Sequence, residues 1–352
     1  DKTLYNQVFK KLTDLGDFIG IEGELFMTKV GAMCVRVDDF KMLSKTLKPL
    51  PLPKTDEEGH VFDAFTDPEL RYRMRYVDLV VNPQVKEVFM KRTKLFTAMR
   101  TFFNEAGYME VETPVLQSIP GGAAARPFIT HHNSLDIPLY MRIANELYLK
   151  RLIVGGFDGV YEFSKNFRNE GMDRTHNPEF TAMEIYVAYK DYNWMMEMTE
   201  NLLEYCANQV NGTTEATFGE HKVNFKAPYA RVTMTDAIKQ FTGFDITGKS
   251  EDELREAAKS MGIEVNDTMG KGKLIDENFG EKCEGKFIQP TFITDYPKEM
   301  SPLCKSHRDN PELTERFELM VCGKEIANAY SELNDPIDQR ERFENQMALA
   351  AK

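Results

Sequence analysis

The chain has 352 residues, of which 42% are hydrophobic and 28% charged. It can bury a large core, which excludes disordered and collagen-like proteins. It has no apolar run of the roughly 18 residues that a membrane-spanning helix needs, and its start lacks the pattern of a secretory signal, so we expect a cytoplasmic protein with no membrane contact.

The formal net charge of −12 argues against broad contact with nucleic acid, because phosphate binding needs clustered Lys and Arg. Residues 1–54 nevertheless hold nine Lys or Arg and seven Asp or Glu, so the acidic excess lies in the rest of the chain. The five cysteines form no CxxC pair, which argues against a disulfide framework and a structural zinc site.

The first part of the chain predicts part of a small β-domain. Segments 18–30 and 32–43 alternate apolar and polar residues around Gly31, which indicates two short strands and a turn. Residues 48–70 hold four prolines in a polar run, which favours a semi-rigid linker over a helix or a central strand. We therefore predict a domain boundary in this linker.

A long amphipathic helix is predicted next. Asn82 suits an N-cap and Pro83 the first helical position, and apolar residues keep helical spacing until Gly107. Residues 107–117 then alternate up to Pro114, which is typical of a strand at a sheet edge or a subunit interface.

The middle of the chain predicts a helix followed by a pair of strands. Residues 145–154 read as a helix that ends at a Gly-Gly pair, and residues 158–170 and 178–190 read as two strands joined by a polar loop. The short connection favours antiparallel pairing.

The last third predicts a helical insertion and a hairpin. The insertion spans about residues 231–285, where Ser250 and Glu253 form a capping box. Two final strands are expected around a turn at residues 322–324. Since no strand–helix–strand alternation occurs, we expect an α+β fold with an antiparallel sheet flanked by helices.

Polar side chains converge on the predicted strand pair. Period-two spacing places Arg168 and Glu170 on one face of the first strand, and Phe180 and Tyr186 on one face of the second, near the loop residue His176. A guanidinium can bridge two oxygens of a phosphate or carboxylate, and an aromatic ring can stack on a base. The alternative is a solvated hairpin with a surface salt bridge.

The final hairpin carries a second group. Asn328, Tyr330 and Glu332 share one face, while Glu318 and Glu325 can approach each other across the turn. Two such carboxylates repel unless a hard cation such as Mg²⁺ lies between them. Spacing alone favours the alternative of two exposed glutamates.

Longer segments point to a family. Residues 167–186 (FRNEG and HNPEFTAMEIY) resemble motif 2 of the class II aminoacyl-tRNA synthetases, and 107–116 (GYMEVETPVL) resembles their dimer-forming motif 1. Together with 120–128 (PGGAAARPF), 142–152 (RIANELYLKRL) and 323–340 (GKEIANAYSELNDPIDQR), the chain resembles the class II lysyl-tRNA synthetases of bacterial type over practically its whole length.

The resemblance implies a domain order. Residues 1–47 would be the C-terminal part of an OB-fold anticodon-binding domain, residues 48–70 the linker, and residues 71–352 the class II catalytic domain. We find no match to motif 3 of the class, and only part of the OB-fold. We therefore expect a piece truncated at both ends.

The resemblance also assigns an ATP site. Arg168 would be catalytic, holding the ATP α-phosphate and the amino-acid carboxylate while charge grows on phosphorus. The other matching positions for ATP are Glu170, His176, Asn177, Phe180, Glu318 and Glu325. Glu318 and Glu325 would also bind Mg²⁺, which clamps and orients the phosphates.

The amino-acid pocket follows in the same way. The matching positions are Gly122, Glu146, Arg168, Glu184, Tyr186, Asn328, Tyr330 and Glu332. A pocket for a cationic side chain needs unpaired buried carboxylates, and three of these positions supply them. The related aspartyl- and asparaginyl-tRNA synthetases share the architecture, but an aspartate pocket would need Lys or Arg there.

These assignments imply a homodimeric lysine–tRNA ligase that dimerises through residues 107–116. With Mg²⁺, it would join L-lysine and ATP into lysyl-adenylate, and then transfer the lysyl group to tRNA(Lys). Two alternatives stay open: a paralogue that lysylates a protein, and a catalytically silent relative that kept the fold.

Overall fold

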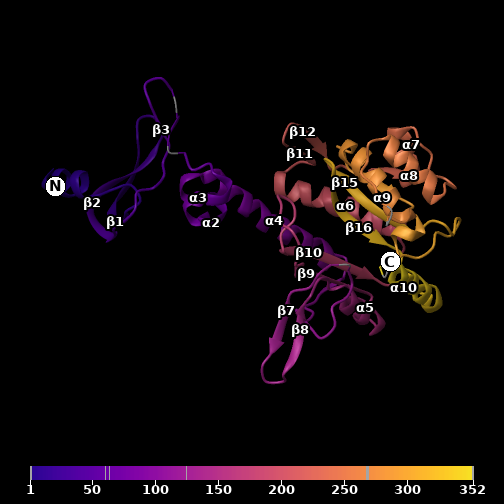
Figure 1. The fold of residues 1–352 in the computed structure, drawn as a ribbon. Coiled ribbons are helices and arrows are strands. Elements are labelled where there is room, and N and C mark those ends of the chain that lie inside the picture. Colours follow the sequence, from indigo (N-terminus) through magenta and orange to yellow (C-terminus); the bar gives the residue numbers. More distant parts are fainter. Residues whose placement is uncertain (1, 60, 63, 124, 267–268, 351–352) are drawn as a thin grey trace. The chain divides into compact units, whose positions relative to one another are not determined.

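The computed structural model describes residues 2–59, 61–62, 64–123, 125–266 and 269–350 (Figure 1). The chain divides into two compact units, residues 1–93 and residues 94–352, and the division falls inside helix α4 (Pro83–Glu105). No helix among the described residues is long and apolar enough to cross a membrane.

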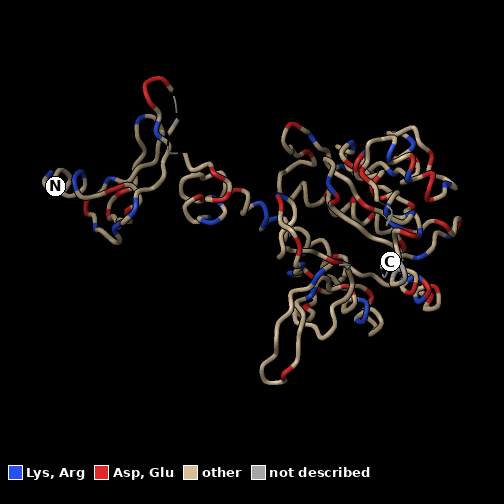
Figure 2. The backbone as a smooth tube through the Cα atoms, in the orientation of Figure 1, with Lys and Arg blue, Asp and Glu red and all other residues tan. Residues whose placement is uncertain are grey.

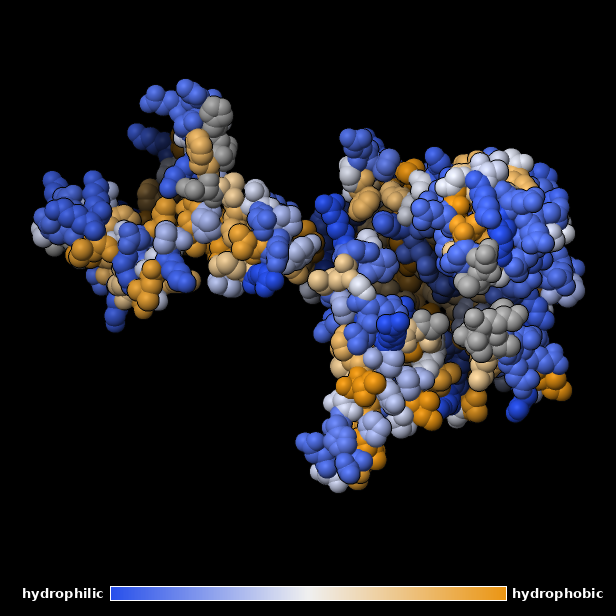
Figure 3. Space-filling view, in the orientation of Figure 1, coloured by the Kyte–Doolittle hydropathy of each residue, from blue (hydrophilic) through white to orange (hydrophobic). Residues whose placement is uncertain are grey.

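The first unit is built on one antiparallel strand pair. After η1 (Leu4–Phe9) and α1 (Lys10–Leu12), strand β1 (Phe18–Met27) pairs with β2 (Met33–Ser44) across a turn in which Gly31 has a φ of +82°. The two strands are confirmed; β1 ends three residues before the expected end, and β2 is shifted by one residue. Large apolar side chains such as Phe18 and Leu25, each 71% exposed, stay on their surface (Figure 3). The strand pair is consistent with part of an OB-fold.

The predicted linker contains more regular structure than expected. A hairpin of β3 (Lys54–Thr55) and β4 (Val61–Phe62) has an acidic turn (Figure 2). Helix α2 (Pro68–Arg73) begins within the segment, because Asp67 accepts a hydrogen bond from the Leu70 amide and Pro68 occupies the first helical position. Helix α3 (Arg75–Val81) follows. The division of the chain into domains at this linker stays a prediction.

The second unit combines several small sheets with helices. Its helices are the end of α4, α5 (Glu146–Val154), α6 (Tyr192–Asn211), α7 (Met234–Thr242), α8 (Glu251–Ser260), α9 (Lys271–Lys282), η2 (Glu284–Lys286), η3 (Lys298–Met300) and α10 (Pro336–Ala350). Its strands are β5 (Met109–Glu110), β6 (Leu116–Gln117), β7 (Ile129–His132), β8 (Ile137–Met141), β9 (Gly159–Phe167), β10 (Glu179–Val187), β11 (Glu215–Phe218), β12 (His221–Asn224), β13 (Ala230–Thr233), β14 (Thr291–Thr294), β15 (Arg316–Val321) and β16 (Lys324–Tyr330). The α+β class is confirmed.

The largest sheet has the order β13-β14-β15-β16 and carries helices on both faces (Figure 1). Alternation along its strands turns Phe292, Phe317 and Leu319 toward α6, and Ile293 and Met320 toward α7, α8 and α9. The predicted final hairpin is confirmed as β15 and β16, and the predicted insertion contains three helices. The pair β13–β14 is parallel, which the sequence did not indicate.

A second sheet has the order β10-β9-β5. Its strands β9 and β10 are antiparallel as predicted. The expected strand over 107–117 is instead two short strands: β5, which runs parallel to β9, and β6, which pairs with β8 in another sheet. Side chains of β9 alternate, so that Tyr161 packs against α4 and α6 while Glu162 points to the opposite, polar face.

The placement of two predicted residues on β9 is wrong. The strand ends at Phe167, so Arg168 and Glu170 lie in the following loop and the period-two argument does not apply to them. The reason is that the register places Pro178 opposite Arg168: the Arg168 amide donates to the Pro178 carbonyl, but proline has no N–H to continue the ladder, and the next amide, of Asn169, donates to the Arg126 carbonyl.

A buried ion pair ties three segments together. Arg142 Nη1 lies 2.9 Å from Glu162 Oε1, and both side chains are 4% exposed. Glu162 also accepts from Thr113 Oγ1 at 2.7 Å and from Asn145 Nδ2 at 3.0 Å, while Arg142 Nε donates to the Lys165 carbonyl. The network therefore fixes the segment before β6, strand β9 and the start of α5.

We expect Arg142→Met to lower the free energy of unfolding by about 3–5 kcal/mol, because it leaves the Glu162 carboxylate buried without its cation. Urea unfolding of the full-length protein measures this. Lys165→Met is the control: its exposed pair with Glu179 spans 3.8 Å, so its loss should stay below about 1 kcal/mol. Equal losses for the two variants would contradict the assigned role of the buried pair.

Candidate amino-acid and nucleotide site

One large cavity gathers the residues predicted to bind the amino acid. It has a volume of about 1300 Å³, and α5, β10, α6, β16 and the loop around residues 300–308 supply its walls. All eight predicted positions line it: Gly122, Glu146, Arg168, Glu184, Tyr186, Asn328, Tyr330 and Glu332. Three carboxylates and one guanidinium therefore share a single space.

Gly122 lets its loop lie directly against the start of α5. Its φ is +89°, and a Cβ at this position would lie 3.2 Å from the Ala144 Cβ and 3.3 Å from the Glu146 Cβ. A larger residue would be strained both by this backbone conformation and by these contacts. The backbone of the loop thus comes within reach of a ligand near Glu146.

Glu146 and Glu332 are joined by a cation of the protein itself. Lys150, one turn further along α5, forms ion pairs with Glu146 Oε1 and, at 2.8 Å, with Glu332 Oε2. Tyr330 Oη donates to Glu146 Oε1 at 2.9 Å. The expectation that the carboxylates of this pocket are unpaired is therefore wrong for these two.

Burial and the ion-pair partners shift the pKa values of Lys150 and Glu332 in opposite directions. Burial alone would lower the pKa of Lys150, but the Glu332 and Glu146 carboxylates outweigh it and raise that pKa. Burial raises the pKa of Glu332, although the Lys150 ammonium opposes the rise. At neutral pH the ammonium is thus firmly charged.

Glu184 forms the side wall of the cavity on β10. Tyr186 Oη donates to Glu184 Oε2 at 3.0 Å. Burial raises the pKa of Glu184, and the nearby Glu146 carboxylate adds to the rise. A bound cation would stabilise the ionised Glu184 carboxylate, so this wall favours a positively charged ligand.

Arg168 lies at the cavity edge with its guanidinium free of carboxylates. Its guanidinium carbon is 5.1 Å from the centre of the Phe180 ring, and Nε lies 3.4 Å from the Ile143 carbonyl oxygen. Among the described residues no carboxylate forms an ion pair with it. An anionic group of a ligand can therefore take both of its outer N–H groups.

The structure does not bring the other predicted ATP residues into this cavity. Glu170, His176 and Asn177 lie in the exposed loop between β9 and β10; Glu170 Oε1 accepts from the Arg126 amide at 3.4 Å, and the other two bond locally. His176 Nδ1 is 2.8 Å from Asp173 Oδ2, and Asn177 Nδ2 donates to the Glu179 carbonyl. Phe180 contacts Arg168 but does not line the cavity wall.

The candidate metal ligands lie on the β15–β16 hairpin. Glu318 pairs in register with Asn328, and Glu325 with Met320 after a register shift. Desolvation and the nearby Glu318 charge raise the pKa of Glu325 to about 7. Arg316 forms an ion pair with Glu318. Within the described residues no group of three or more His, Cys, Asp or Glu could hold a metal ion.

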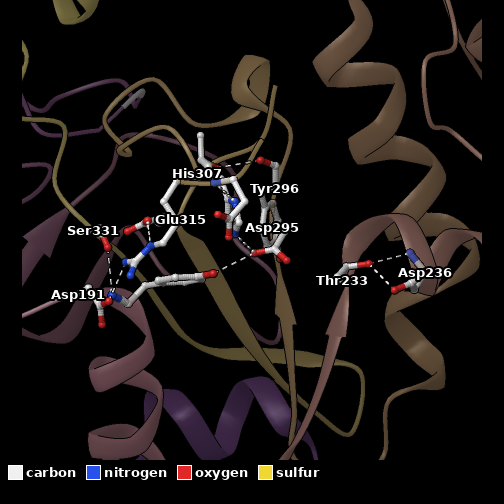
Figure 4. A network of polar contacts seen from close by, with 12 residues as sticks. Asp191, Thr233, Asp236, Asp295, Tyr296, His307, Glu315 and Ser331 are labelled. Carbon is white, nitrogen blue, oxygen red and sulfur yellow. Dashed lines mark hydrogen bonds and ion pairs between the residues drawn. The ribbon is translucent and has the colours of Figure 1, made fainter. Parts of the chain in front are cut away.

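A polar network supports the chain just after β16, around Ser331 (Figure 4). Glu332 is the next residue. Ser331 Oγ accepts from the Tyr192 amide at 3.0 Å, and the Ser331 amide donates to the Glu315 carbonyl. Arg308 bridges Glu315 and Asp191, each at 2.7 Å. These contacts fix Glu332 against the start of α6 and explain how a residue beyond the strand end keeps its place.

Sequence reasoning missed three members of the site. Lys150 stands four residues after Glu146, a spacing that signals an ion pair on a helix. Arg316 and Tyr296 flank Glu318, with the Arg316 guanidinium carbon 4.4 Å from the Tyr296 ring centre. The spacing of residues around Glu318 does not predict that contact, because Tyr296 lies outside the β15–β16 hairpin.

Comparison with known proteins shows the family of the chain. The family model of class II tRNA synthetases (D, K and N) matches residues 67–352. The chain is 82% identical over 352 residues to the lysine–tRNA ligase of Christiangramia forsetii, 70% identical to that of Porphyromonas gingivalis, and 64% identical to that of Azobacteroides pseudotrichonymphae. The whole chain takes part in each match, and it spans 62%, 61% and 70% of these relatives, respectively.

Proposed function

The chain belongs to the class II tRNA synthetases of the D, K and N group, and from this premise we propose that the whole protein is a lysine–tRNA ligase. The observation that carries the proposal is the acidic cavity. Glu146, Glu184 and Glu332 line one space with Arg168 at its edge. An amino acid with a cationic side chain complements Glu184 and the two carboxylates that Lys150 bridges, and the Arg168 guanidinium can take its carboxylate.

The proposed reaction has two steps. Arg168 holds the lysine carboxylate against the ATP α-phosphate, and a carboxylate oxygen attacks phosphorus in line as pyrophosphate leaves. A ribose hydroxyl of the tRNA then attacks the carbonyl carbon of lysyl-adenylate, and AMP leaves. In the proposed pocket, Glu146 and Glu332 hold the two ammonium groups, while Glu184 and Tyr186 close around the side chain.

The remaining assignments for ATP belong to the same proposal. Glu170 and Asn177 would contact the adenine, His176 the terminal phosphate, and Phe180 would stack on the base. In the structure Phe180 already contacts Arg168, whereas Glu170 accepts from the Arg126 amide and His176 and Asn177 bond to neighbouring residues. Nucleotide binding would have to draw these last three toward Arg168. We further propose a cytoplasmic homodimer that forms through residues 107–116.

The donor set on the final hairpin fits Mg²⁺. Glu318 and Glu325 offer hard oxygen ligands, and desolvation together with the Glu318 charge raises the pKa of Glu325, although the Arg316 guanidinium opposes the rise. These two carboxylates would hold Mg²⁺, which would offset their repulsion and neutralise phosphate charge. Arg316, which pairs with Glu318, holds that side chain in place.

We expect activation by free Mg²⁺ to weaken as the pH falls below 7. Glu325, whose pKa is raised to about 7, gains a proton there, and the metal must displace it. The half-saturating Mg²⁺ concentration should rise by up to about tenfold per pH unit. Pyrophosphate exchange at varied Mg²⁺ and at three pH values measures this. A half-saturating concentration that is independent of pH would contradict the role of Glu325.

Transfer of lysine to tRNA tests the proposed function against its rivals. The full-length protein should attach labelled lysine to tRNA(Lys) in the presence of ATP and Mg²⁺. Label on a protein instead of tRNA would support the protein-lysylating paralogue. No formation of lysyl-adenylate would support the silent relative.

A further inference from the structure

Lys150 places an ammonium group inside the candidate lysine pocket. It extends from α5 to Glu146 on the same helix and to Glu332, 2.8 Å away, on the segment after β16. Its side chain is 25% exposed, and Nζ lies 5.8 Å from the centre of the Tyr330 ring. The protein's own ammonium thus bridges the two carboxylates proposed above to hold the ammonium groups of lysine.

The bridge crosses between elements that are distant in sequence. Glu146 lies in the first turn of α5, whereas Glu332 follows β16 and is fixed by the contacts around Ser331. Two partly buried carboxylates that face each other repel, and each favours protonation. Lys150 is the contact that offsets this repulsion and sets their separation.

Lys150 also changes the charge around the two bridged carboxylates. Among the residues assigned to the amino-acid pocket, Glu146, Glu184 and Glu332 are acidic, whereas Lys150 and Arg168 are cationic. Lys150 therefore partly neutralises the carboxylates assigned to bind lysine before lysine arrives.

We propose that Lys150 is a positioning residue of the amino-acid pocket: it bridges Glu146 and Glu332 before lysine binds, and it yields part of both carboxylates to the ammonium groups of the bound lysine. This inference rests on the proposed function and deepens it. Lys150 contacts the carboxylates and not the reacting atoms, so its effect falls on lysine binding.

The proposal predicts a specific change with pH. The titratable and charged groups that face the bridge are Glu146, Glu184, Tyr186, Arg168, Cys304, Tyr330 and Glu332. In Lys150→Met the Glu332 carboxylate loses the cation that opposes the burial-driven rise of its pKa, so it takes up a proton at higher pH than before. Lysine must then displace that proton, so its binding weakens in acid.

Calorimetric titration of the full-length protein with L-lysine at pH 6.0 and pH 8.0 tests this. We expect the ratio of the two dissociation constants to be about tenfold larger for Lys150→Met than for the wild type, with ATP affinity unchanged. Lys150→Gln should behave likewise, which keeps the test available if the Met variant fails to fold. Lys150→Arg should restore the wild-type ratio.

Arg151→Met is the matched control. It removes one positive charge from the next position of α5, where the Arg151 guanidinium lies over the Tyr148 ring and not in the cavity. The ratio of its lysine dissociation constants at pH 6.0 and pH 8.0 should equal that of the wild type. A loss of affinity in the Lys150 variants that is equal at both pH values, or no loss at all, would overturn the proposal. A wild-type protein that binds no lysine would overturn the proposed function, and the inference with it.

Discussion

Arg168→Ala is expected to reduce lysine-dependent pyrophosphate exchange by about 10³-fold or more, as removal of a guanidinium that stabilises a phosphoryl-transfer transition state does. The Arg168 guanidinium lines the cavity and forms no ion pair with a carboxylate among the described residues, so we propose that it holds both the lysine carboxylate and the α-phosphate. Because the loss falls on the transition state, it should appear mainly in kcat.

The protein should still fold in this variant. Among the described residues, the Arg168 side chain has one weak hydrogen bond, to the Ile143 carbonyl at 3.4 Å, and one ring contact, with Phe180. Arg168→Lys keeps the charge without the bidentate geometry, so it should fall between the wild type and Arg168→Ala. Arg151→Ala serves as the control for loss of a nearby arginine. Exchange at nearly the wild-type rate in Arg168→Ala would contradict the proposed role.

Glu332→Gln is expected to weaken lysine binding by about 2–4 kcal/mol while ATP binding stays nearly unchanged. The amide keeps the shape of the side chain but removes the countercharge from a position fixed by the Ser331 contacts. Lys150 would lose its 2.8 Å partner as well, so some of the loss reflects the disturbed bridge.

Separate titrations with lysine and with an ATP analogue measure this selectivity. Glu179→Gln is the control, because its carboxylate is 58% exposed on β10 and pairs only loosely with Lys165. Equal losses for lysine and ATP in Glu332→Gln would mean that Glu332 supports the fold and does not select the amino acid.

The elements with local signals were predictable from the sequence. Helix α4 follows an Asn-Pro start, α8 has its capping box between Ser250 and Glu253, and the β9–β10 and β15–β16 pairs have short connections. In each case the residues that decide the element lie within a few positions of it, so periodicity and caps are sufficient.

The pairings between distant segments were not predictable in this way. Strand β13 runs parallel to β14 and pairs Ala230 with Thr291, although α7, α8, α9 and η2 lie between the two strands in the sequence. Strand β5 pairs with β9 over only two residues. Such contacts follow from packing around the whole core, which periodicity does not encode.

Residue spacing does not predict the site either. The eight cavity residues were identified through resemblance, since the spacing of Glu146 and Glu332 says nothing about their meeting. Lys150 was overlooked because its helical spacing explains only its pair with Glu146, whereas its second partner lies 182 positions away. Arg168 was assigned to a strand that ends one residue earlier, at Phe167.

The most direct test of the account is amino-acid-dependent ATP–pyrophosphate exchange by the full-length protein, with lysine, aspartate and asparagine offered separately. It requires no tRNA and reports the amino-acid pocket and adenylate formation together. The account predicts exchange with lysine alone, because three carboxylates line the cavity. Exchange with aspartate or asparagine, or with none of the three, would contradict it.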